Sequence, residues 1–190
     1  MKTPLRFQVT EYDCGTVSLY NAISYLFERE EIPAKVLKVI HKYTLDCYDE
    51  AGNHGQGGTS KEAIDKISTF MTNYENDNNF KIKCEKLDGV QVTIDKINDC
   101  VNEKGCALIK CHLEGGHYVI ITNVVKDKVY IFDPYYLDKN KYKDEEVKII
   151  LNKPFTYNRV VSVRRLLSET TKDFALGDKN KRECVLINRI

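Results

Sequence analysis

The stretch CALIKCHLEGGHYVIITNVVKDKVYIFD, residues 106–133, decides the fold. It contains three runs rich in β-branched and aromatic residues, at 106–112, 117–125 and 128–133, each of strand length. Four residues connect the first two runs, and two residues connect the last two. Because connections this short cannot cross over a sheet, the stretch predicts three consecutive antiparallel strands.

The residues before this stretch carry helical patterning. Apolar side chains at helical spacing predict a helix from about residue 14 to 29, with its N-terminus at or beside Cys14. Pro33 suits the first position of a second helix, because an apolar stripe follows it. The N-terminal part of the chain is therefore expected to be helical.

Two threonines mark the starts of further helices. Thr59 and Glu62 have the spacing of a capping box, which predicts a third helix over about 60–73. Thr93 precedes another helical pattern, which Gly105 ends. The glycine-rich residues just before the third helix lack the preceding strand of a phosphate-binding loop, and we expect a loop or small hinge over a cleft.

Strand patterning also occurs outside the central stretch. Residues 80–85 and 183–189 alternate apolar and polar side chains, as strands do. Residues 158–167 fit either a strand or a helix, and 138–148 form a charge-rich stretch expected to be a loop. Helices followed by an antiparallel sheet predict an α+β fold.

The length and charge of the chain limit its possible roles. A chain of 190 residues is expected to form one domain over residues 1–190. Lys and Arg number 29 against 28 Asp and Glu, so the net charge of +1 provides no broad basic field for binding nucleic acid. No apolar run reaches the roughly 18 residues of a membrane span.

The cysteines indicate a reducing compartment. The N-terminus has no apolar segment of the kind found in signal peptides, and seven cysteines cannot all pair. We therefore expect a cytoplasmic protein. Cys106 and Cys111 face opposite sides of their strand and cannot share a metal ion, so no metal or cofactor is expected.

Two other pairs of residues are given ordinary structural roles. Cys84 and Cys100 share their faces with apolar residues and are expected to be core thiols. The adjacent Arg164 and Arg165 are too few to mark an anion site, and both are expected to face solvent.

Cys14 is the candidate nucleophile. At the start of a helix, the open backbone N–H groups and the helix dipole favour a thiolate, which is the reactive form of cysteine. A cysteine nucleophile needs a base, and His117 opens an apolar strand where a histidine is out of place unless the strand end borders a cleft. His112 is a weaker alternative, and His41 and His54 are expected at the surface.

Asp133 and Gln8 complete the candidate site. Asp133 follows the last strand of the central stretch, so the turn near residue 126 places it at the same end of the ladder as His117. It can therefore orient the histidine. Gln8 precedes the helix of Cys14, and its side-chain amide can donate a hydrogen bond to a developing oxyanion beside the Cys14 backbone N–H.

These residues carry a resemblance to a known family. The strings QVTEYDCG, HYVIITNV and IFDP resemble the bacteriocin-processing, double-glycine-leader peptidases, a branch of the papain-like cysteine peptidases. The similar region covers about residues 5–137, and 138–190 form an unassigned extension. The resemblance implies a papain-like fold, with Cys14 as nucleophile, His117 as base, Asp133 as its orienter and Gln8 as oxyanion donor.

The resemblance extends to the catalytic apparatus more than to the substrate. Family members that cut leader peptides are typically fused to an ABC transporter, whereas this chain shows no membrane span and no nucleotide-binding loop. It is expected to be a stand-alone member acting on a peptide or amide by hydrolysis. The alternatives are an acyltransferase that uses the same three residues and a non-catalytic peptide-binding module, and the oligomeric state stays open.

Overall fold

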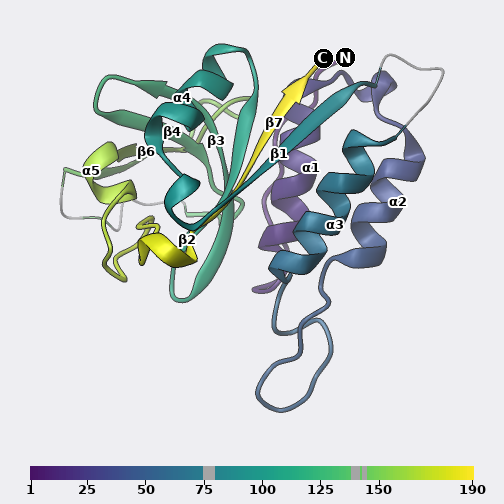
Figure 1. The fold of residues 1–190 in the computed structure, drawn as a ribbon, viewed down its shortest axis with the longest axis horizontal. Helices are drawn as coiled ribbons and strands as arrows, with labels where there is room; N and C mark the ends of the chain where they lie inside the picture. The colour runs from purple at the N-terminus through teal and green to yellow at the C-terminus, as the bar shows by residue number, and fades with distance from the viewer. Residues whose placement is uncertain (75–79, 138–141, 143–144) are drawn as a thin grey trace.

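The computed structural model describes residues 1–74, 80–137, 142 and 145–190. Its helices lie on both sides of a sheet (Figure 1), and the first begins at Cys14 as the sequence predicts. In chain order the α-helices are α1 (Cys14–Leu26), α2 (Ala34–Tyr43), α3 (Lys61–Thr72), α4 (Ile94–Asn102) and α5 (Val163–Leu166).

Within the described residues, seven strands form one sheet in the order β1-β7-β2-β3-β4-β6-β5, and each of their pairings is antiparallel. The α+β fold is therefore confirmed. The strands are β1 (Ile82–Asp88), β2 (Cys106–His112), β3 (Gly116–Val125), β4 (Lys128–Phe132), β5 (Val147–Ile149), β6 (Arg159–Ser162) and β7 (Glu183–Arg189).

The central stretch forms the expected meander of β2, β3 and β4. Cys111 pairs with His117 near the end where β2 passes into β3. Two residues connect β3 to β4, and Lys126 takes the left-handed conformation that tight hairpins require, with φ 53°. A register shift between Ile121 and Asn123 bends β3 where it pairs with β4.

The alternation of side chains along the strands produces a core on each face of the sheet. Leu108 and Ile120 pack in the core beneath α1, α2 and α3. Their neighbours Ile109 and Ile121 pack in the opposite core, which α4 covers. Figure 1 shows α1, α2 and α3 grouped on one side of the sheet, with α4 and α5 on the other.

The cap of α3 differs from the prediction by one residue. The oxygen of Ser60, not Thr59, accepts the N–H of Ala63 at 3.0 Å. Thr59 is buried, and its hydroxyl accepts the N–H of Leu45 at 3.1 Å. The Thr59 hydroxyl is therefore engaged by Leu45, and the neighbouring Ser60 caps the helix in its place.

The C-terminal part of the chain belongs to the sheet. The ambiguous residues 158–167 contain both a strand, β6, and a short helix, α5. Residues 183–189 form the predicted strand, β7, which lies between β1 and β2. Part of the expected charge-rich loop, 138–141 and 143–144, lies outside the described residues, and its C-terminal end enters β5.

One surface prediction is wrong. Arg164 is exposed, but the Arg165 side chain is only 5% exposed. Its Nη2 atom lies 3.1 Å from Oε2 of Glu146, so an ion pair accounts for its burial. Cys100 is buried and Cys84 packs beside the α1–α3 core, as expected. Within the described ranges, no helix has the length and apolar character of a membrane span.

Candidate active site

Cys14 is the first residue of α1, and its side chain is buried. The preceding Asp13 does not cap the helix with its side chain. Its carboxylate instead accepts the backbone N–H groups of Thr10, at 3.0 Å, and Val9, at 3.3 Å. Because the first N–H groups of a helix have no partner within the helix, Cys14 lies where anionic groups are stabilised.

A glycine allows α1 to approach the sheet. A Cβ atom on Gly15 would lie 2.8 Å from Cβ of Thr59 and 3.3 Å from the ring of Tyr118. One turn further along, the Ser18 hydroxyl donates to the carbonyl of Tyr118 at 2.8 Å. These contacts place the start of α1 beside the start of β3, where His117 is located.

His117 lies between Cys14 and Asp133. Its Nε2 atom is 2.8 Å from Oδ1 of Asp133, and both side chains are buried. The imidazole also interacts with the Cys14 side chain. Since Nε2 faces the carboxylate, Nδ1 is the ring nitrogen left for the thiol. The structure therefore brings together the three residues that the sequence singled out.

The surroundings of His117 favour its charged form. Burial lowers the pKa of the imidazole, but the hydrogen bond to Asp133 and the contact with Cys14 outweigh burial and raise it from 6.5 to about 9. At neutral pH the ring is then an imidazolium between a carboxylate and a thiol. Such a neighbour stabilises a thiolate.

The side chain of Asn158 makes two hydrogen bonds to the backbone of Asp133, and the sequence did not predict this contact. The backbone N–H of Asp133 donates to Oδ1 of Asn158 at 2.7 Å, and Nδ2 of Asn158 donates to the Asp133 carbonyl at 2.7 Å. Asp133 also accepts the N–H of Tyr135 with Oδ1 at 2.9 Å. Asp133 directly follows β4 and Asn158 directly precedes β6. No sequence motif links residues 25 apart at the ends of two strands, so the pairing appears only in the fold.

Arg159, the next residue, also reaches Asp133 and was also missed. Its Nη2 atom lies 3.1 Å from Oδ2 of Asp133, and both side chains are fully buried. The same nitrogen donates to the carbonyl of Tyr135 at 2.7 Å. Nη2 of Arg159 is not aligned for a hydrogen bond to Oδ2 of Asp133, so the two groups interact as an ion pair.

Gln8 is near the site, but its amide is engaged elsewhere. Its backbone N–H donates to the carbonyl of Pro134 at 2.8 Å, which joins the Gln8 segment to the residue after Asp133. Its side-chain Nε2 donates to the carbonyl of Thr10 at 2.8 Å. Oε1 is buried, with no hydrogen-bond partner among the described residues. An oxyanion role therefore requires the amide to turn away from Thr10.

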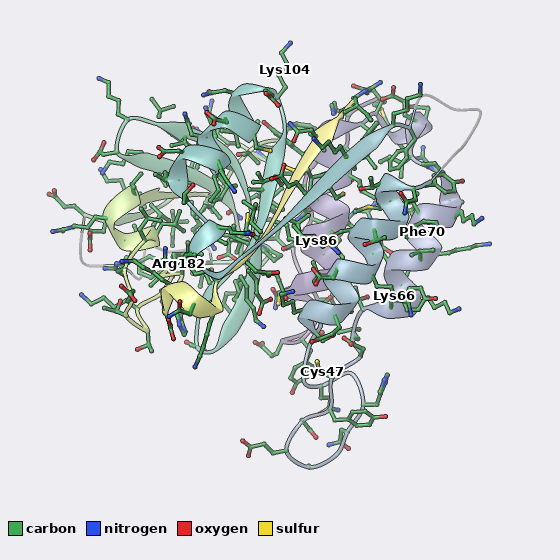
Figure 2. The ribbon with its side chains drawn as sticks, viewed as in Figure 1. Cys47, Lys66, Phe70, Lys86, Lys104 and Arg182 are labelled. Atoms are coloured by element: carbon green, nitrogen blue, oxygen red, sulfur yellow. The ribbon has the colours of Figure 1, made fainter. Side chains whose placement is uncertain are left out.

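A cavity of about 640 Å³ opens beside Cys14. One wall is the glycine-rich segment 56–60, which Asp46 anchors by accepting the N–H of Ser60 at 2.8 Å. Figure 2 shows Cys47 at the root of the loop that projects beyond α3. The opposite wall comes from the sheet and includes Lys110, Tyr118 and Glu183.

The remaining histidines and cysteines lie outside this arrangement. His41 and His54 are exposed, as expected, and His112 lines a different cavity, of about 440 Å³. Cys106 and Cys111 pack in opposite cores. In the part of the chain that the structure describes, no three His, Cys, Asp or Glu side chains gather in a way that could hold a metal ion.

The α+β architecture and the Cys14 helix packed on an antiparallel sheet fit the papain-like fold. The chain belongs to the peptidase C39-like family, whose family model matches residues 1–162. No curated protein and no solved structure matches the chain. Membership supports a cysteine peptidase-like function, and strand β7, which lies between β1 and β2, is beyond the matched residues.

Proposed function

We propose that the protein is a cysteine peptidase or amidohydrolase in which Cys14, His117 and Asp133 act as a triad. The observation that carries the proposal is the position of His117, which lies 2.8 Å from the Asp133 carboxylate and interacts electrostatically with the Cys14 side chain. A nucleophile, a base and an orienting group in series are what acyl transfer to a thiol requires.

The first half of the reaction forms a thioester. The Cys14 thiolate attacks the substrate carbonyl carbon, and the carbonyl electrons move to oxygen. The backbone N–H of Cys14 stabilises this oxyanion, together with the Gln8 amide once it leaves Thr10. The His117 imidazolium then protonates the leaving nitrogen, the carbon–nitrogen bond breaks, and the amine departs.

The second half regenerates the enzyme. Neutral His117 takes a proton from water as the water oxygen attacks the thioester carbon. The carbon–sulfur bond then breaks, which releases a carboxylic acid and restores the thiolate and imidazolium. Throughout the cycle Asp133 fixes the ring orientation and balances its positive charge.

The cavity beside Cys14 supports a peptide as substrate. It lies between the 56–60 segment and the sheet, and its volume of about 640 Å³ leaves room for several residues of an extended chain. The resemblance extends to the catalytic apparatus more than to the substrate, so peptides of varied sequence are the candidates to test. All seven cysteines are free, which supports a reducing, cytoplasmic location. The sharing of one sheet by early and late strands supports a single domain over residues 1–190.

Incubation with a library of peptides and amides, followed by mass spectrometry of products and intact protein, tests this function. The proposal expects cleaved products with wild type and none with Cys14→Ala. Cys47→Ala is the matched control, because Cys47 lines the same cavity and should be dispensable. A long-lived acyl adduct on Cys14 that amines discharge faster than water would indicate an acyltransferase instead. Absence of both products and adduct would leave a binding module.

A further inference from the structure

We infer that Arg159 is a positioning residue of the triad, whose guanidinium keeps the Asp133 carboxylate turned toward His117. This inference rests on the proposed function, because it assigns Arg159 a part in the same site. Arg159 does not contact the substrate cavity beside Cys14. It acts on His117 through Asp133.

The environment of Arg159 is unusual for a charged side chain. It is the largest of the fully buried side chains, at 0% exposure. Its Nη1 donates to the carbonyl of Asn158 at 3.0 Å and its Nη2 to the carbonyl of Tyr135 at 2.7 Å. Tyr135 follows Asp133 by two residues, and Asn158 is the residue whose side chain binds the Asp133 backbone. The guanidinium is therefore fixed by the backbone around the carboxylate.

The burial of this pair is not explained by stability alone. Removing two charges from water costs several kcal/mol per ion, and the attraction between them often does no more than offset that cost. Placing Arg159 3.1 Å from Asp133 therefore adds little to folding. It does, however, give the buried Oδ2 atom of Asp133 a neighbour of opposite charge, which fixes the orientation of the carboxylate.

The groups that face Asp133 make Arg159 the second cation of the site. His117 comes from β3 and Arg159 from β6. The charge of Asp133 also acts on the Cys111 thiol of β2, but burial raises the pKa of this thiol well above 9, so it stays neutral. Tyr142, which contacts Asp173, likewise stays neutral because burial raises the pKa of its hydroxyl. Asp173, whose charge acts on both Cys111 and Tyr142, is a further acid nearby.

The consequence of losing Arg159 follows from this arrangement. Arg159 holds Oδ2 of Asp133 from one side while Oδ1 faces His117, so loss of the guanidinium leaves the carboxylate free to turn away from the ring. Burial lowers the pKa of the imidazole, and the hydrogen bond to Asp133 is the largest of the effects that raise it. Without that bond burial would dominate, and the pKa of the imidazole would fall. Arg159 thus acts on the base through the position of the carboxylate.

The test is an NMR titration of the His117 ring, assigned by comparison with His117→Gln, in two substituted proteins. Arg159→Gln keeps hydrogen-bonding ability but removes the charge, and should bring the His117 pKa from about 9 to 6.5 or below. Arg159→Lys keeps the charge and should leave the pKa close to 9. Arg165→Gln is the matched control, because Arg165 is also buried and lies 3.1 Å from a carboxylate, that of Glu146.

An unchanged His117 pKa in folded Arg159→Gln, or an equal fall in Arg165→Gln, would overturn the inference. If circular dichroism shows that Arg159→Gln does not fold, Arg159→Met provides the same comparison with an apolar side chain of similar length. The titration needs no substrate. A failure of the proposed function, with no cleavage by wild type, is therefore distinguishable from a failure of this inference.

Discussion

His117 and Asp133 are sixteen residues apart in the chain, yet Nε2 of one lies 2.8 Å from Oδ1 of the other. The two-residue turn between β3 and β4 produces this contact, because it returns the chain to the end of the ladder where β3 begins. The carboxylate therefore reaches the imidazole from a strand fixed on its other side by β6. The histidine lies on β3, and Asp133 and Asn158 lie directly beside the ends of β4 and β6.

Replacing Asp133 with Asn should inactivate the protein without unfolding it. The amide can still contact His117, but it carries no charge and favours the wrong ring tautomer, a change worth on the order of 10⁴ in turnover in serine triads. Peptide cleavage and circular dichroism measure the two effects. Asp127→Asn, at the exposed turn between the same strands, is the control and should retain activity. Equal activity of the two variants would contradict the triad.

The raised pKa of His117 should make part of the stability depend on pH. Its folded value of about 9 lies above the value of 6.5 for an unperturbed imidazole, so protonation favours the folded state. This contribution is complete below pH 6.5 and is lost as the pH rises through 9. The difference in free energy of unfolding between wild type and His117→Gln should shrink over that interval, measured by urea denaturation. A difference that stays constant with pH would exclude a raised pKa.

Gln8→Ala should slow turnover and leave the fold intact. Loss of one oxyanion donor costs on the order of 3 kcal/mol in comparable sites, or roughly a hundredfold in kcat. The side chain makes a local hydrogen bond to Thr10, so stability should change little. Gln91→Ala, at an exposed position of the 3-10 helix Gly89–Gln91, is the control. If Gln8→Ala and Gln91→Ala have the same kcat, Gln8 has no part in the mechanism.

Gly15→Ala should disturb the approach of α1 to the sheet. The new methyl group would meet Thr59 at 2.8 Å and the Tyr118 ring at 3.3 Å, both too close for unstrained packing. Overpacking of this kind costs about 1–3 kcal/mol. Thermal denaturation should show a lower Tm, and alkylation of Cys14 should slow because the thiol moves relative to His117. A variant as stable and as reactive as wild type would contradict the packing described for Gly15.

The sequence predicted the parts of this structure that depend on local pattern. The alternation in residues 106–133 defines three strands and their direction, and the position of Cys14 at a helix start follows from apolar spacing. His117 and Asp133 were brought together by the same short turn. These features need no knowledge of distant contacts.

The features that were missed depend on contacts between distant residues. Asn158 and Arg159 lie at the start of a four-residue strand, which is too short for a periodic pattern, and their partners follow β4. Arg165 is buried because Glu146 neutralises it, which its neighbours in sequence do not reveal. The insertion of β7 between β1 and β2 is likewise a matter of long-range pairing.

The most direct test of the central claim is a map of cysteine reactivity. One equivalent of iodoacetamide is added at neutral pH, and the labelled peptides are identified by mass spectrometry in wild type and in His117→Ala. Burial raises the pKa of every other thiol, to about 11 for Cys100 and about 12 for Cys84, and it does the same at the remaining sites, Cys47, Cys106, Cys111 and Cys184.

The account predicts that Cys14 takes nearly all of the label in wild type, and that this preference is lost in His117→Ala, because the imidazolium that stabilises the thiolate is then absent. The half-buried Cys47 of the same cavity is the internal reference for access. Labelling spread evenly over the seven cysteines of wild type, or selective labelling of Cys14 that persists without His117, would contradict the claim that these two residues act together.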